Sequence, residues 1–439
     1  MSFASLEYLP FLAFVVGAFA FVPARLRAAF LLVASAWFYA DAGTVACAVL
    51  AAQTAIGYAS GLVLARVSSA RARRIVLAAS VACLLGVLAA FKYAHVGPLP
   101  LGISFYTFAV LGSVADVSRR TIAPVRDPIE YALFVAFFPV LVCGPIERVG
   151  HLLPQLRSLR QLALDDVSVG ARRIVCGLVK KLVVAERLGA FALPIAARPD
   201  DRSSLELALG SVAMLGYLYA DFSAYTDIAR GSARLFGVEL LLNFRRPLLS
   251  TTLVEFWQRW HVTLVDWIRD YVYSPLAGRR LTHASIWRNN LLALSLVGLW
   301  HGASAKYLAW GLLNGALVSA YHSARLARVR VPRGIPGWAL TMAIASALIV
   351  AFFTADLASA GRYFARLASM EGGGDPIPLA VPALLLGGLA VQLVAARVDL
   401  ERVWSRAGAL GRSAALAGGV ASLALWGASG SGAFVYFAF

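Results

Sequence analysis

Charged residues are scarce in this 439-residue chain, and acidic ones are the scarcest. Asp, Glu, Lys and Arg together make up 14% of the sequence, whereas 60% of it is hydrophobic. A soluble globular domain is about 45–50% apolar and about 25% charged, so this composition excludes an ordinary soluble protein. Apolar stretches long enough to span a membrane recur from end to end. We therefore predict an all-α, polytopic membrane protein with about 11–13 transmembrane or re-entrant helices.

The chain also lacks the acidic residues that would balance its 40 basic ones, and its formal net charge is +17. The basic residues form short clusters between apolar stretches, as in the cytoplasmic loops of membrane proteins. We therefore expect a membrane lipid environment and no nucleic-acid partner. Placing the clusters at 25–27, 66–74, 325–333 and 397–412 in the cytoplasm predicts that both termini lie outside.

Several motifs of soluble catalysis are missing. The four cysteines form no C-x-x-C pair, and the chain has no H-x-x-x-H, no H-E-x-x-H and no G-x-S-x-G. These absences argue against a metal site and against a serine nucleophile. We expect neither a metal nor a tightly bound cofactor.

One of the six histidines ends an apolar stretch. His301 lies in L-V-G-L-W-H-G-A (296–303), directly after Trp300. Such a histidine is either a hydrogen-bonded packing residue or a proton-transfer group. Acyl transfer to an alcohol requires a group that takes the hydroxyl proton near neutral pH, and histidine is suited to that role.

A second histidine, His261, lies in a tryptophan-rich segment, E-F-W-Q-R-W-H-V-T-L-V-D-W-I-R-D-Y (255–271). Helical spacing predicts that Trp257, His261 and Leu264 share one face, with Arg259 on another. Two interpretations remain open for this segment. It is an amphipathic helix at the membrane interface, or it is a re-entrant helix that brings His261 to a site.

A third segment places carboxylates in an apolar helix. In Y-L-Y-A-D-F-S-A-Y-T-D-I-A-R-G (217–231), Asp221 and Tyr225 are one turn apart and close enough to hydrogen-bond. Buried carboxylates need such partners. Asp221 and Tyr225 therefore belong either to a structural network or to a catalytic site.

Seven motifs together resemble the membrane-bound O-acyltransferases, in particular the bacterial branch of alginate O-acetylation and teichoic-acid D-alanylation. They occur in the order of that family and span about half of the chain. They are L-P-L-G-I-S-F-Y-T-F (99–108), F-F-P-V-L-V-C-G-P-I-E-R (137–148), G-L-V-K-K-L-V-V-A-E-R (177–187), Y-A-D-F-S-A-Y-T-D-I-A-R-G (219–231), N-F-R-R-P-L-L-S-T-T-L-V-E-F-W-Q-R-W-H (243–261), R-D-Y-V-Y-S-P-L-A-G (269–278) and L-W-H-G-A (299–303).

The resemblance implies a ring of helices around a thin central tunnel and assigns roles to residues. His301 of L-W-H-G becomes the catalytic histidine and His261 of R-W-H the second functional one. The tail F-V-Y-F-A-F (434–439) is similar to an aromatic tail whose Tyr436 would carry the acyl group. The tail is otherwise an aromatic anchor at the membrane interface. The side chains expected to line the tunnel or contact substrate are Trp300, Asp221, Tyr225, Trp257 and Arg259.

The implied reaction takes an acyl group, acetyl in the first place, from cytoplasmic acetyl-CoA and passes it across the bacterial inner membrane. The implied partners are an extracytoplasmic acyltransferase and a surface polysaccharide. We expect N-terminal helices over 1–97, a catalytic core over 98–322 and C-terminal helices with the tail over 323–439. Two alternatives remain: D-alanyl transfer from a carrier protein to a cell-wall polymer, and a transporter or flippase.

Overall fold

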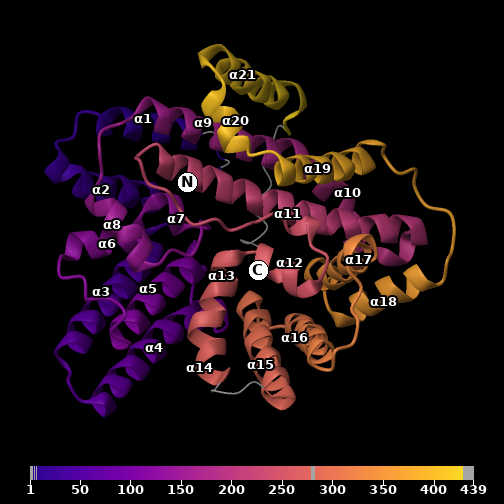
Figure 1. Ribbon diagram of the computed structural model, residues 1–439, viewed down its shortest axis with the longest axis horizontal. Coiled ribbons are helices and arrows are strands. Elements are labelled where there is room, and N and C mark those ends of the chain that lie inside the picture. The colour runs from indigo at the N-terminus through magenta and orange to yellow at the C-terminus, as the bar shows by residue number, and fades with distance from the viewer. Residues whose placement is uncertain (1–2, 4, 6, 278–281, 429–439) are drawn as a thin grey trace. The chain divides into compact units, whose positions relative to one another are not determined.

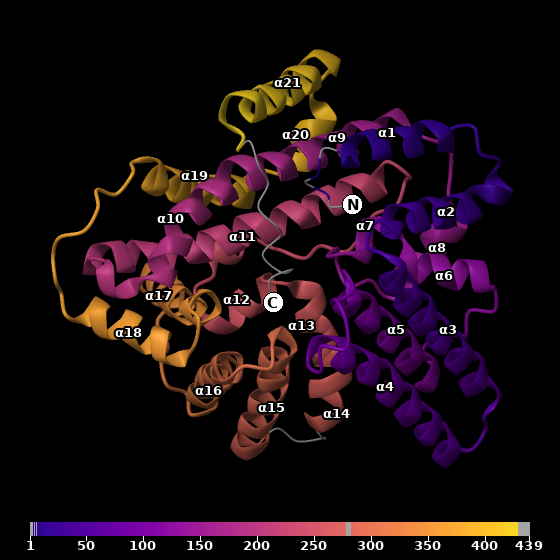
Figure 2. The ribbon, with the colours of Figure 1, turned by 180° about the vertical axis from the view of Figure 1, so that it is seen from behind.

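The computed structural model describes residues 3 and 5, residues 7–277 and residues 282–428. All regular elements in these ranges are helices, so the predicted all-α class is confirmed (Figures 1 and 2). The chain divides into two compact units, residues 1–177 with 225–242, and residues 178–224 with 243–439. We call them the first and the second unit.

The first unit contains the N-terminal helices. They are α1 (Tyr8–Phe19), α2 (Arg27–Ala40), α3 (Thr44–Arg66), α4 (Ala70–Lys92), α5 (Ile103–Ser118), α6 (Pro128–Ala136), α7 (Phe138–Leu141), α8 (Val149–Arg157) and most of α9 (Leu164–Val179). Helices α3, α4 and α5 pack against one another. The C-terminal third of α11 (Ser204–Arg234) and the extended segment after it also belong to this unit.

The second unit contains the rest of α11 and the later helices. They are α10 (Glu186–Ala197), α12 (Leu253–Arg259), α13 (Val262–Ile268), α14 (Ser274–Ala277), α15 (His283–His301), α16 (Ala305–Leu326), α17 (Gly334–Phe353), α18 (Leu357–Ala368), α19 (Ala380–Arg397), α20 (Leu400–Arg406) and α21 (Ala409–Trp426). The predicted division at residues 97 and 322 stays a prediction.

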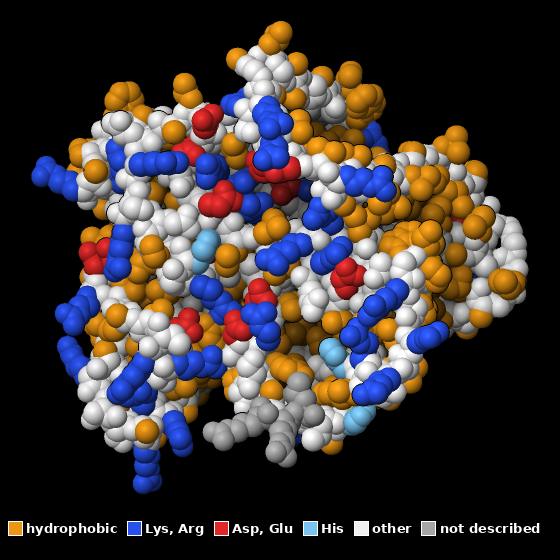
Figure 3. Space-filling model, in the orientation of Figure 1, with side chains coloured by type: hydrophobic (Ala, Val, Ile, Leu, Met, Phe, Trp, Pro, Cys, Tyr) orange, Lys and Arg blue, Asp and Glu red, His pale blue; other side chains and the backbone are white. Residues whose placement is uncertain are grey.

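Six helices of the described chain are long and apolar enough to cross a membrane: α3, α4, α11, α17, α19 and α21. In the most apolar part of α11, 72% of the residues are buried within the protein, whereas 11% are buried in that of α19 and none in that of α21. Hydrophobic side chains cover the surface over α19, among them Leu386 and Val391 (Figure 3). Such a surface suits a lipid environment. The chain is thus a multi-pass membrane protein.

Salt bridges fix the segment that follows α11 in the first unit. Glu239 accepts hydrogen bonds from Arg173 and Arg230, and the backbone N–H of Glu239 donates to Gln155 at 2.9 Å. Burial alone would raise the pKa of Glu239, but the two guanidinium groups outweigh it and hold that pKa below its usual range. A depressed carboxyl pKa contributes stability at neutral pH that is lost as the pH falls through it.

Helices α15 and α16 form a tight hairpin in the second unit (Figures 1 and 2). Glycines allow the close approach. A Cβ at Gly298 would overlap the carbonyl oxygen of Tyr307, and one at Gly311 would overlap that of Leu294. Small residues of this kind let membrane helices pack backbone against backbone.

Replacing Gly311 with valine should therefore weaken the hairpin, because rigid backbone atoms occupy the space that the side chain needs. Overpacking of a well-filled contact costs about 1–3 kcal/mol, so we expect a lower unfolding temperature in detergent. Gly387→Val on α19, where no atom lies within 4 Å of the new Cβ, is the matched control and should change little. Equal unfolding temperatures for the two variants would contradict this account of the hairpin.

Candidate active site

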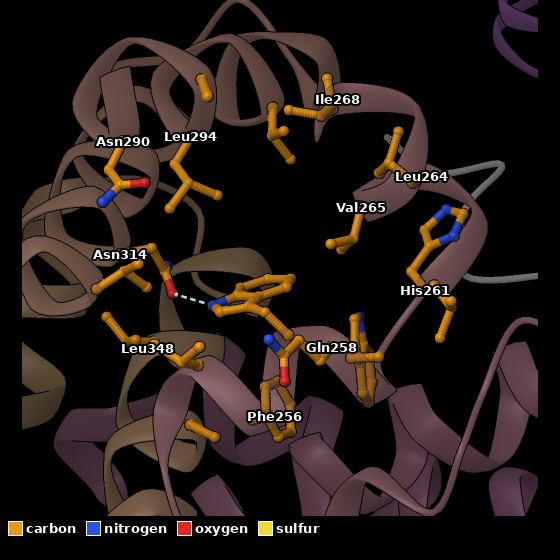
Figure 4. Close-up of a pocket in the computed structure, with 18 of the residues that line it drawn as sticks. Phe256, Gln258, His261, Leu264, Val265, Ile268, Asn290, Leu294, Asn314 and Leu348 are labelled. Carbon is orange, nitrogen blue, oxygen red and sulfur yellow. Dashed lines mark hydrogen bonds between the residues drawn. The ribbon is translucent and has the colours of Figure 1, made fainter. Parts of the chain in front are cut away.

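A cavity of about 590 Å³ lies within the second unit. Its walls come from α11, α12, α13, α15, α16 and α17, and most of them are apolar side chains such as Leu264, Val265 and Leu348 (Figure 4). A few polar groups interrupt this lining. They are Arg245, Gln258, His261, Asp266, Arg269, Asn290, His301, Asn314 and His322. Binding sites for small molecules commonly combine a mainly apolar wall with a few polar groups that fix orientation.

His261 stands at a break between two short helices. The continuous helix predicted over 255–271 is wrong, because α12 ends at Arg259 and α13 begins at Val262. His261 has a φ of 44°, in the left-handed region that a non-glycine residue rarely adopts. The predicted grouping nevertheless holds in space, since Trp257, His261 and Leu264 all line the cavity.

Backbone hydrogen bonds from residues 243–245 hold this break. Arg245 N–H donates to the carbonyl of Arg259 at 2.9 Å, and Val262 N–H donates to the carbonyl of Asn243 at 2.9 Å. The carbonyl of His261 itself accepts from Leu264 and Val265. Residues 243–245 therefore pair with 259–262 across the turn and support its strained conformation, as functional sites often require.

The His261 ring is buried and contacts Asn243. Its Nδ1 lies 2.9 Å from Asn243 Oδ1, and the Phe222 ring packs edge-on at 4.7 Å between centroids. His261 lies outside the six candidate spans, and burial lowers the pKa of its imidazole to about 3. The ring is therefore neutral at physiological pH, which is the form that accepts a proton.

His301 is the last residue of α15, as the sequence predicts, and is 4% exposed. Aromatic rings surround it. Its ring centroid lies 4.6 Å from that of Trp300, 4.8 Å from Phe352 and 5.7 Å from Trp310, the last two edge-on. His301 thus lines the cavity from within an apolar cage that limits the access of water.

Of the two predicted tryptophans, Trp257 lines the cavity, whereas Trp300 does not but lies beside both histidines. The Trp300 ring centroid is 4.6 Å from that of His301 and 6.4 Å from that of His261, so this indole neighbours both imidazoles. Trp257 lines the cavity, and its Nε1–H donates to Asn314 Oδ1 at 3.2 Å (Figure 4). This bond ties α12 to α16 across the cavity.

The other predicted site residues do not line the cavity. Arg259 pairs with Glu255, one turn away on α12. Asp221 pairs with Lys181 at 2.7 Å, and both side chains are fully buried. Tyr225 belongs to the first unit, where its ring lies 5.9 Å from Phe3. Tyr436 falls outside the described residues.

Sequence reasoning missed three polar residues of this region. Asn243 and Lys181 both occur in motifs that marked the family, but neither received a role. No pattern in the sequence pointed to Asn314, because its hydrogen-bond partner Trp257 lies on a helix far away in the sequence. Within the described ranges, no three His, Cys, Asp or Glu residues gather as a metal site would require.

The family model of the membrane-bound O-acyltransferases matches residues 6–332, so the chain belongs to this family. The predicted family is thereby confirmed, and its description, membrane-bound O-acyltransferase, agrees with the predicted class of enzyme. All the cavity-lining residues up to His322 fall in the matched region.

Similar proteins carry related names. A probable alginate O-acetylase of Pseudomonas syringae is 35% identical over 62% of this chain and 52% of its own length. A peptidoglycan O-acetyltransferase of Helicobacter pylori is 30% identical over 62% of the chain and 58% of its own length. A teichoic acid D-alanyltransferase of Streptococcus thermophilus is 28% identical over 49% and 55%. The matches thus span little more than half the length of these three relatives.

The buried pair of Lys181 and Asp221 gives a test of whether Asp221 is structural. Lys181→Met should destabilise the protein strongly, because it leaves a buried carboxylate without its cation, and such losses cost about 3–5 kcal/mol. The double variant Lys181→Met/Asp221→Leu should recover part of that loss, since the fully buried carboxylate is gone and only Glu186, which Lys181 also binds at 2.9 Å, is left without this cation. Denaturant unfolding in detergent measures both. A double variant no more stable than Lys181→Met would contradict a mainly structural role for the pair.

Proposed function

We propose that the protein transfers an acyl group, acetyl in the first place, from cytoplasmic acyl-CoA for the O-acylation of a cell-surface polysaccharide. The observation that carries this proposal is the arrangement of His261 and His301 on one mainly apolar cavity in the matched region. The names of the relatives agree with O-linked transfer to surface polymers.

In the proposed reaction, the acceptor hydroxyl attacks the thioester carbonyl of the donor. His301 takes the hydroxyl proton as the new C–O bond forms. The C–S bond then breaks, and the leaving thiolate takes up a proton to give free coenzyme A. The ester product and the thiol balance the thioester and the alcohol, so no other reactant is needed.

The cavity suits a donor with an apolar acyl end and an anionic remainder. Its apolar wall, with Leu264, Val265 and Ile349, would exclude water from the thioester. Arg245 also lines the cavity and would attract a negatively charged part of the donor. Trp300, which neighbours both histidines, would help to keep the reacting groups aligned.

The remaining parts of the proposal rest on the sequence. The basic clusters predict that both termini lie outside the inner membrane. There Tyr436 would either receive the acyl group or anchor the tail at the membrane interface. A partner acyltransferase and the polysaccharide would be found on the same side. A ring of helices around a tunnel would provide the passage. Asp221, Tyr225 and Arg259 would then act as supporting groups and not as proton carriers.

D-alanyl transfer from a carrier protein is the closest alternative, and the Streptococcus thermophilus relative carries that name. Saturable use of acetyl-CoA without any carrier protein separates the two donors. A transporter would instead move its substrate across vesicles without forming a covalent bond.

His301→Ala should strongly reduce transfer, because the variant removes the proposed base. Labelled acetyl-CoA is incubated with purified protein in nanodiscs, with polysaccharide as acceptor, and both ester formation and coenzyme A release are measured. Loss of one general base costs about 100- to 10,000-fold. His283→Ala, at the exposed other end of α15, is the matched control and should stay active. Wild-type rates in His301→Ala would refute the role of His301.

A further inference from the structure

The side chain of Asn243 is fully buried at the turn that carries His261. Its Oδ1 lies 2.9 Å from His261 Nδ1, 3.0 Å from Thr263 Oγ1 and 3.4 Å from the backbone nitrogen of Thr263. One amide oxygen therefore contacts three polar groups, one on His261 at the break and two on Thr263 in the first turn of α13.

The backbone N–H of Thr263 decides which way the amide points. A main-chain N–H is only a donor, so the atom that faces it must be an acceptor, which is the amide oxygen. The reversed amide would put its NH₂ group against both this N–H and His261. Because the oxygen only accepts, His261 Nδ1 must carry the proton that it shares with Asn243.

We propose that Asn243 is a positioning residue that holds His261 as the tautomer protonated on Nδ1, which leaves Nε2 as the nitrogen able to accept a proton. This inference rests on the proposed acyl transfer for its consequence, but the tautomer itself is a property of the resting protein. The same residue also fixes the turn, since its carbonyl accepts from Val262 N–H at 2.9 Å.

An amide serves this purpose differently from a carboxylate. It fixes the tautomer through a hydrogen bond but brings no negative charge, so it stabilises the imidazolium form less than a carboxylate would. The rings packed near His261 are Phe222 from α11 and Trp300 from α15. The charged and titratable groups that share its cavity are Arg245, Asp266, Arg269, Tyr273, His301 and His322.

The variant Asn243→Asp tests the effect of placing a negative charge beside His261, where the wild-type amide has none. A carboxylate beside Nδ1–H would favour the imidazolium and raise the pKa of His261. The imidazolium form of His261 would then persist to higher pH. We expect the midpoint of the His261 titration, followed by nitrogen-15 NMR, to move to higher pH by about one unit or more, the usual effect of one adjacent opposite charge. KM for acetyl-CoA should change little.

Asn243→Leu tests the hydrogen bond. It removes the acceptor at similar size, so the imidazole loses its orientation and kcat should fall about 10- to 100-fold, as for other residues that orient a functional histidine. Asn289→Leu is the matched control, because Asn289 is also a fully buried asparagine of the second unit but does not line the cavity. If the loss of any buried asparagine lowered kcat, Asn243→Leu and Asn289→Leu would lose kcat equally.

Nitrogen-15 NMR of histidine-labelled protein in nanodiscs tests the tautomer without any assay of activity. The His261 signals are assigned by comparison with His261→Gln. Wild-type protein should show a protonated Nδ1 and an unprotonated Nε2, and Asn243→Leu should show a mixture. A wild-type signal from protonated Nε2 would overturn the proposal, even if Asn243→Leu failed to fold. So would an Asn243→Asp protein in which the titration of His261 is unchanged.

These arms separate the two proposals. An Nδ1-protonated His261 in a protein that forms no ester under any condition would support the positioning by Asn243 and overturn the proposed acyl transfer. An active enzyme with a His261 protonated on Nε2 would support the proposed acyl transfer and overturn the positioning by Asn243.

Discussion

The break between α12 and α13 is the constraint on which the candidate site depends. Without it, His261 would be one more residue of an amphipathic helix, and its ring would turn with that helix. The left-handed turn at His261 and the hydrogen bonds from residues 243–245 direct the ring onto the cavity wall instead. Since the strained turn is unfavourable by itself, the extended segment before α12 is as much a part of the site as the histidine.

The apolar environment makes these local hydrogen bonds and ion pairs important for the stability of the fold. A polar group in an apolar interior has little water to pair with, so the protein must supply its partners. The pairs of Lys181 with Asp221, Trp257 with Asn314 and Asn243 with His261 all join elements distant in the sequence. Each therefore satisfies a buried polar group and fixes the relative placement of two segments in the second unit.

The apolar stretches were enough to predict the class of fold. His301, which ends an apolar stretch of the sequence, is the last residue of α15. The break at His261 could not be predicted, because no proline or glycine marks it and the bonds that hold it come from residues 243–245. For Asp221, helical spacing suggested Tyr225, whereas the structure pairs it with Lys181 from another helix.

The central claim is that the cavity bearing His261 and His301 binds the acyl donor. The most direct test is an electron cryo-microscopy structure in nanodiscs with a thioether analogue of acetyl-CoA, which cannot transfer its acyl group. The account predicts density for the acyl end among Trp257, His261, Trp300 and His301. Density for the bound analogue at another place, with this cavity empty, would contradict it.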